Sequence, residues 1–143
     1  MSLMGELEKV IDEIIQKDKN RLNFMLSPEP IECDIELRTS TINFSMKDWE
    51  KNQREEIHGG AIAAMFDTAM GATAAAFDYG KDVTTAALQV SYIRPMTKSK
   101  YSFVSEVTNL GKTLIRVGSK AVDLETSKIV AISTATYVPY KSK

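Results

Sequence analysis

The spacing of apolar side chains changes twice in the first third of the chain. Residues 5–19 carry apolar side chains three and four positions apart, which predicts an amphipathic helix. Pro28 and Pro30 then break the chain before residues 31–37, where apolar and charged side chains alternate. This alternation predicts a half-buried strand, which residues 42–46 extend or pair with.

Residues 60–77 form an alanine-rich segment in which only Asp67 is charged. The apolar spacing is helical, and a helix without a solvated face must be covered on most sides. The segment is long enough to span a membrane, but a carboxylate at its centre costs about 2.5 to 3.5 kcal/mol on insertion. We therefore expect a helix buried inside the protein and no association with a membrane.

Four strand-like runs follow this segment, at residues 83–93, 101–109, 113–124 and 129–138. Short polar turns join the last three runs, which predicts an antiparallel meander. Five or six antiparallel strands in one curved sheet can wrap a helix, so we expect an α+β fold with a long central helix, formed as one domain by residues 1–143. Such a sheet leaves one side of the helix open, which the first helix and a second subunit could close.

The composition narrows the class of protein. Of the 143 residues, 43% are hydrophobic and 26% are charged, which is enough apolar material for a packed core. Eighteen Lys and Arg residues balance nineteen Asp and Glu residues, so the broad basic surface of general nucleic-acid binding is not expected. The single cysteine, Cys33, excludes an internal disulfide and is expected in the core, and a single histidine excludes a histidine-rich metal site. The N-terminus has no basic and apolar leader, so we expect a cytoplasmic protein.

A His-Gly-Gly sequence, His58-Gly59-Gly60, opens the predicted central helix. Glycines at a helix start leave backbone N–H groups free and pointing outward, and the helix dipole reinforces them. Such donors suit a developing negative charge, so these residues could form an oxyanion hole. The alternative is that the two glycines only allow a tight turn.

Asp67 lies nine residues after His58, in the middle of the uncharged helix. A buried carboxylate is costly unless it is paired or used, which makes Asp67 a candidate functional group. The alternatives are a partly exposed helix face, or a structural bond to a hydroxyl such as that of Thr68 or Ser91. The chain has no second histidine and no Gly-x-Ser-x-Gly motif, so a serine-hydrolase triad that includes His58 is not supported. We therefore favour a hydrogen-bonding role for His58 in its loop.

These residues together resemble a known family. Asn52, five intervening residues, His58-Gly59-Gly60 and then Asp67 look like the signature of the hot-dog-fold thioesterases of the phenylacetic-acid-degradation type. The run from Thr85 to Tyr92-Ile93-Arg94-Pro95 resembles the strand that follows in that family. The resemblance covers roughly residues 30–138.

The resemblance implies hydrolysis of acyl-coenzyme A thioesters without a metal or organic cofactor. It implies that the Gly59 N–H polarises the thioester carbonyl, and that Asn52 lies against that carbonyl or the attacking water. It implies that Asp67 activates water or attacks directly, that Thr85 positions the water, and that His58 orients the loop. Members of the family are dimers, usually paired into tetramers.

Further residues are candidates for substrate binding. Gly60 adds a second glycine at the helix start, and Met70 could line an acyl tunnel, although apolar residues at helical spacing also make ordinary core. Arg94 and Lys112 could meet the phosphates of coenzyme A, or could be solvated surface. One position departs from the family: Glu55 stands where many members have glycine. With Glu56 it would repel acidic substrates, unless both side chains turn outward.

Two other functions are open on the same fold. A hydratase or dehydratase is disfavoured because the chain lacks the His-x-x-x-x-Pro-x-x-Pro-Gly pattern of such enzymes. A non-catalytic acyl-coenzyme A-binding module would have no need for the Asp67 carboxylate.

The distance along the helix constrains any shared role of Gly59 and Asp67. Eight residues at about 1.5 Å each separate them by about 12 Å, which exceeds the reach of a carboxylate side chain. If both act on one carbonyl, Asp67 must meet the Gly59 of a two-fold-related partner, and the active unit is at least a dimer.

Overall fold

The computed structural model describes residues 2–15 and 18–140, and it begins with two short helices, α1 (Leu3–Ile15) and α2 (Leu22–Leu26). α1 buries Leu7, Val10 and Ile11, the apolar stripe that predicted it. The expected helix over residues 5–19 is too long at its end: residues 16–17 lie outside the described residues, and 19–20 form a turn. The one-turn helix α2 was not predicted, because five residues are too few to show a period.

A hairpin of β1 (Glu29–Asp34) and β2 (Thr39–Ser45) forms one edge of the sheet. The expected strand over residues 31–37 is wrong beyond Asp34, whose carboxylate accepts hydrogen bonds from the N–H groups of Glu36 and Leu37 at 2.9 and 3.0 Å. These bonds fold the chain into a turn. Ile35 and Leu37 are therefore 72% and 63% exposed, whereas Cys33 packs half-buried against the core.

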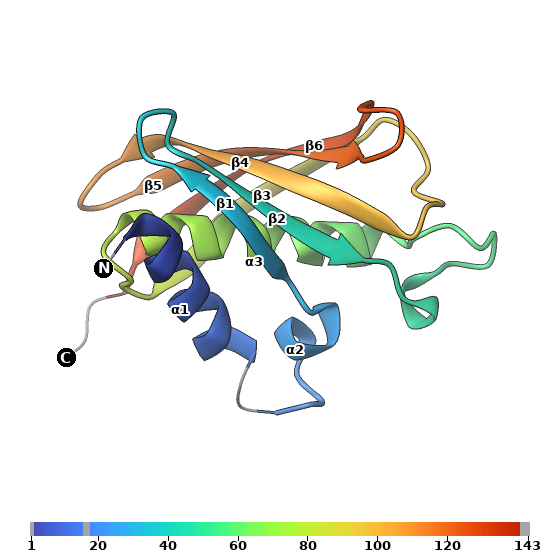
Figure 1. Ribbon diagram of the computed structural model, residues 1–143, viewed down its shortest axis with the longest axis horizontal. Coiled ribbons are helices and arrows are strands. Elements are labelled where there is room, and N and C mark those ends of the chain that lie inside the picture. Colours follow the sequence, from blue (N-terminus) through green and yellow to red (C-terminus); the bar gives the residue numbers. More distant parts are fainter. Residues whose placement is uncertain (1, 16–17, 141–143) are drawn as a thin grey trace.

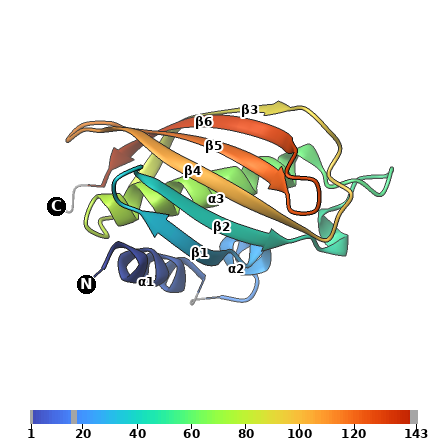
Figure 2. The ribbon, with the colours of Figure 1, turned by 45° about the horizontal axis from the view of Figure 1, so that its top comes forward.

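The long helix α3 (Gly59–Phe77) carries the chain from β2 to the far edge of the sheet, where β3 lies beside β6. The remaining strands are β3 (Val83–Tyr92), β4 (Lys100–Leu110), β5 (Ile115–Asp123) and β6 (Ile129–Pro139). All neighbours pair antiparallel in the order β1-β2-β4-β5-β6-β3, as Figures 1 and 2 show. The α+β architecture, the meander and the central helix are confirmed.

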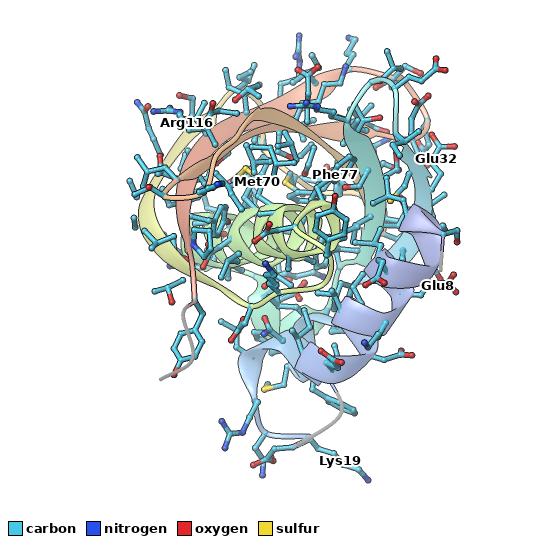
Figure 3. The ribbon with its side chains drawn as sticks, turned by 90° about the vertical axis from the view of Figure 1, so that its left-hand side faces the viewer. Glu8, Lys19, Glu32, Met70, Phe77 and Arg116 are labelled. Atoms are coloured by element: carbon cyan, nitrogen blue, oxygen red, sulfur yellow. The ribbon has the colours of Figure 1, made fainter. Side chains whose placement is uncertain are left out.

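The core lies between α3 and the concave face of the sheet. Phe103 of β4 makes edge-on contacts with the rings of Phe44 and Phe66, at centroid distances of 5.0 and 4.8 Å. Figure 3, viewed along the helix, shows the sheet curving around α3 with Met70 inside and Glu32 and Arg116 directed outward. α3 is apolar enough to cross a membrane by length and composition, but 61% of it is buried in the fold, as expected of a core helix.

One side of α3 is not fully covered by the sheet. Gly60, Ala63, Asp67 and Gly71 recur along it three and four residues apart, and all keep partial or full exposure. β3 borders this side, where Thr85 donates a hydrogen bond to Asp67. Among the described strands β3 lies at the edge of the sheet beside β6, and it carries no charged side chain. Edge strands usually carry charges or prolines that discourage pairing with another chain, so this side has the character of a contact surface.

His58 caps the N-terminus of α3. Its backbone is extended, and its Nδ1 accepts a hydrogen bond from the N–H of Gly60 at 2.8 Å. A side-chain acceptor at this position satisfies one of the N–H groups that the first helical turn leaves without a partner.

Replacing His58 should therefore weaken the helix start. We expect His58→Ala to lower the free energy of unfolding by about 1 kcal/mol, the usual value of an N-cap, in a urea titration. His58→Asn is the matched control: asparagine is a good N-cap, so this variant should recover most of the loss. Equal stability of the Ala and Asn variants would show that the cap contributes nothing.

Candidate functional site

A hollow of about 340 Å³ lies at the N-terminal end of α3. It is lined by the loop before the helix, by the first turn of the helix and by the segment after β3; the residues are Asn52, Arg54, Glu56, Ile57, Gly59, Ile62, Tyr92, Ile93, Arg94, Pro95 and Met96. The structure thus brings Asn52 and Gly59 together, as the family resemblance implies.

The peptide bond between Gly59 and Gly60 is held at both ends. The Tyr92 hydroxyl donates to the carbonyl oxygen of Gly59 at 2.6 Å, and the N–H of Gly60 donates to His58. Within residues 2–15 and 18–140, no acceptor pairs with the N–H of Gly59. The expectation of two free donors is therefore wrong for Gly60, whose N–H the cap takes up, while Gly59 keeps a free N–H beside the hollow.

Asn52 organises the loop that leads to the helix. Its Oδ1 accepts from the N–H groups of Arg54 and Glu56 at 2.9 and 3.2 Å. These bonds occupy the carbonyl end of the side chain, so the Nδ2 amide is the end left for another partner.

Glu50 supports the same loop from behind. It is 1% exposed, and its carbonyl oxygen accepts from the N–H of His58 at 2.7 Å. Its carboxylate accepts from the N–H of Lys47 at 2.8 Å, and burial raises the pKa of this carboxyl above its usual value.

The structure accounts for the departure at Glu55. This residue has φ of 61°, the left-handed region where glycine is unstrained, which is a physical reason for glycine at this position in other chains. Its carboxylate lies 3.8 Å from the Lys51 ammonium at the surface, and Glu56 pairs with Arg54 at 2.8 Å. Both acidic side chains therefore form ion pairs with basic residues of their own loop.

A second hollow, of about 190 Å³, lies halfway along α3. It contains Asp67 and Thr85; the full lining is Val10, Ile14, Asn23, Asp67, Thr68, Gly71, Ala72, Ala75, Asp82, Val83, Thr85 and Tyr137. The two hollows share no residue. The structure therefore places the predicted site residues in two groups, one at the start of α3 and one near its middle.

Asp67 is bound by two hydroxyl groups. Thr85 Oγ1 and the Tyr137 hydroxyl each lie 2.9 Å from Asp67 Oδ1, and the Tyr137 hydroxyl also lies 3.0 Å from the Asp67 carbonyl oxygen. The alternative bond to Thr68 is not formed, because that hydroxyl donates to Asn23 at 2.8 Å. Tyr137 carries no signal in the sequence as a site residue, since only the pairing of β3 with β6 places it opposite Thr85.

A β-bulge in β3 lets side chains near both ends of the strand contact the helix. Thr85 and Tyr92 are an odd number of residues apart, so in a regular strand their side chains would face opposite sides of the sheet. In the β3–β6 pairing, Thr85 is opposite Tyr137 and Ala87 opposite Thr136, which leaves Ala86 as the extra residue. The bulge turns Thr85 and Tyr92 to the same face, where they contact Asp67 and Gly59.

The predicted substrate-binding residues are spread over the molecule. Arg94 lines the first hollow and donates to the Ile129 carbonyl oxygen at 2.8 Å. Met70 is 0% exposed in the core and lines neither hollow. Lys112 is exposed in the turn between β4 and β5.

Comparison with solved structures shows the fold. The E. coli PaaI protein from the phenylacetic acid degradation operon matches with a TM-score of 0.82 at 17% identity, covering 99% of both chains. Thioesterase superfamily member 2 of zebrafish matches with a TM-score of 0.82 at 12% identity, covering 98% of this chain and 100% of that one. The Streptococcus mutans protein smu.793, solved bound to acetyl-CoA, matches with a TM-score of 0.71 at 16% identity, covering 82% of this chain and 91% of that one. The hot-dog fold is confirmed.

No curated protein matches the chain in sequence. The sequence profile of the thioesterase superfamily matches residues 56–130, a stretch that runs from the loop before α3 to the start of β6. This match covers the His-Gly-Gly sequence, Asp67 and the strand that carries Thr85, and it confirms the resemblance identified from those residues. The chain belongs to the thioesterase superfamily.

Proposed function

We propose that the protein hydrolyses acyl-coenzyme A thioesters to a free acid and coenzyme A. The observation that carries this proposal is Asp67: a carboxylate at the middle of an otherwise uncharged helix, held by two hydroxyl groups and lining a hollow. Asp67 is partly exposed, which is the alternative of a partly exposed helix face, but its carboxylate borders a hollow and is held by hydroxyl donors, an arrangement typical of a functional group. Membership of the thioesterase superfamily supplies the reaction class.

The proposed reaction divides its tasks between the two hollows. The free N–H of Gly59, at a helix N-terminus, stabilises the oxygen of the thioester carbonyl as negative charge develops there. Asp67 takes the proton of a water molecule that attacks the carbonyl carbon, or attacks the carbon itself. When water attacks, the carbon–sulfur bond then breaks, and the thiolate of coenzyme A leaves and takes up the proton from Asp67. When Asp67 attacks, the same bond breaks and leaves a mixed anhydride; water hydrolyses this anhydride, which releases the free acid, restores Asp67 and supplies the proton to the thiolate. Asn52 lies against the carbonyl or the water, Thr85 positions the water, and His58 holds the loop.

This division requires two chains. Gly59 and Asp67 are about 12 Å apart along one helix, so we propose that each site combines Gly59 of one subunit with Asp67 of its two-fold partner. The small residues on the open side of α3 and the uncharged edge of β3 support such a contact. A homodimer is the minimum unit, and pairing of dimers into a tetramer follows the pattern of the family.

The substrate contacts belong to the same proposal. Arg94 in the first hollow, Gly60 at the helix start and Lys112 in the β4–β5 turn are the proposed contacts for coenzyme A. Met70 is fully buried and lines neither hollow, so no contact with the acyl group is proposed for it. The chemistry is complete with a carboxylate, backbone N–H groups and water, so we propose no metal or organic cofactor. Because acyl-coenzyme A is an intracellular thioester, we propose a cytoplasmic location.

A panel of short, medium, long and aryl acyl-coenzyme A compounds tests the function. We expect thiol release, followed with a thiol reagent, that saturates with at least one compound of the panel. A non-catalytic binding module would bind these compounds in calorimetry without releasing thiol, and a hydratase would convert enoyl-coenzyme A without releasing thiol. Either result would overturn the proposal.

The carboxylate of Asp67 should be essential for turnover. Asp67→Asn keeps the shape of the side chain but removes the base or nucleophile, so we expect kcat to fall by at least roughly 100-fold with KM little changed. Asp82→Asn is the matched control, because Asp82 lines the same hollow and, in the part of the chain that the structure describes, its Oδ1 accepts only from the neighbouring N–H of Val83. If steady-state kinetics show an equal loss of kcat in both variants, Asp67 has no specific role in turnover.

The amide of Asn52 should matter through its donor end. Asn52→Asp keeps the oxygen that holds Arg54 and Glu56 but removes the Nδ2 donor. We expect normal folding by circular dichroism and a fall in kcat of about 100-fold, the usual cost of one oxyanion donor. Full activity of this variant would show that Asn52 serves only the loop.

A further inference from the structure

Among residues 2–15 and 18–140, Tyr137 is the one residue hydrogen-bonded to the Asp67 carboxylate that the family resemblance does not assign. It lies near the end of β6, is 1% exposed, and its hydroxyl is 2.9 Å from Asp67 Oδ1. Its ring lies against Gly71, one helical turn after Asp67, where an added Cβ would come within 3.3 Å of the ring. The absence of a side chain at Gly71 thus lets the ring lie close to the helix.

The hydroxyl of Tyr137 has one proton and two acceptors in range. The Asp67 carbonyl oxygen is 3.0 Å away, but as a helical carbonyl it already accepts the N–H four residues later. The ionised carboxylate is the stronger acceptor. Burial, and then the charge of Asp67, raise the pKa of Tyr137 above its ordinary value, so the hydroxyl keeps this proton at any working pH.

Thr85 and Tyr137 both bind Oδ1 of Asp67. Within residues 2–15 and 18–140, Oδ2 has no hydrogen-bond partner, although the residue lines the second hollow. Two donors on one oxygen fix the torsion of the carboxylate and leave the second oxygen as the free one.

We propose that Tyr137 is a positioning residue: with Thr85 it occupies Oδ1 of Asp67 and thereby presents Oδ2 as the oxygen that takes the proton of water or attacks the thioester. This inference rests on the proposed function. It assigns the two oxygens of Asp67 different tasks, one for orientation and one for chemistry. Tyr137 acts only through Asp67 and does not touch the substrate.

The test compares two buried tyrosines. Tyr137→Phe removes the hydroxyl and keeps the ring, and Tyr101→Phe is the matched control, since Tyr101 is also 1% exposed and its hydroxyl binds the N–H groups of Thr97 and Lys98. On the best acyl-coenzyme A of the panel, we expect Tyr137→Phe to lower kcat between about 10- and 100-fold with KM within about twofold. Tyr101→Phe should leave both constants unchanged.

A double-mutant cycle separates positioning from a general structural role. Because Thr85 and Tyr137 hold one oxygen, Thr85→Val with Tyr137→Phe should lower kcat by more than the product of the single losses. Thr85→Val with Tyr101→Phe should give the simple product. Simple multiplication in both cycles, or normal kcat in Tyr137→Phe, would overturn the inference.

A measurement without turnover distinguishes this inference from the proposed function. In urea unfolding, Tyr137→Phe should lower the midpoint less in an Asp67→Ala background than in the wild type, because the carboxylate it binds is already gone. Equal effects in both backgrounds would overturn the inference while leaving the proposed function standing. A wild-type protein that is inactive on the whole panel would instead overturn the proposed function, and with it the catalytic purpose of the contact.

Discussion

The length of the buried helix is the constraint on which the rest of the structure depends. α3 runs uninterrupted from Gly59 to Phe77, with a free N–H at its start and a carboxylate eight residues later. Because a helix is rigid over this distance, the two groups stay about 12 Å apart in one chain. The fold separates the Gly59 N–H from the Asp67 carboxylate, so the proposed shared site requires a partner subunit whose helix runs antiparallel to this one.

The sheet fixes each of the two groups in place through one strand. β3 contacts Gly59 through Tyr92 and Asp67 through Thr85, and the bulge at Ala86 is what turns both side chains to the helix. The same strand is an uncharged sheet edge. A second chain that packs along β3 would therefore lie close to both Gly59 and Asp67.

Most of the fold follows from the local pattern of apolar and polar residues. Where the structure differs from the elements predicted from that pattern, particular hydrogen bonds or backbone angles are the cause. The central helix was predicted because apolar periodicity and a near-absence of charge are visible in the sequence. The strand expected to reach residue 37 ends early because Asp34 bonds to the next backbone N–H groups, a choice that alternation does not reveal. Alternation does not reveal the left-handed backbone of Glu55 either; the glycine of many family members at this position is the signal that points to it.

The residues of the candidate site also differ in whether the sequence reveals them. Asn52, Gly59 and Asp67 are recognisable because they keep fixed spacings along the chain. Tyr137 was missed because it comes 70 residues after Asp67 and reaches it only through the pairing of β3 with β6. That pairing joins two strands that β4 and β5 separate in sequence, and no short-range signal encodes it.

Subunit complementation between Asp67→Ala and Gly59→Pro tests most directly the claim that each site is built from two chains. Proline suits the first position of a helix, and His58 before it already has the extended backbone that proline requires. The proline Cβ would lie 3.3 Å from the Tyr92 ring, so this ring must shift slightly, and circular dichroism and urea unfolding check that the variant is folded. Mixing two inactive, folded parents and allowing exchange gives half heterodimers, each with one intact site. About a quarter of the wild-type activity should return. If the subunits exchange and no activity returns, Gly59 and Asp67 do not act across a subunit interface, and the two-chain site does not exist.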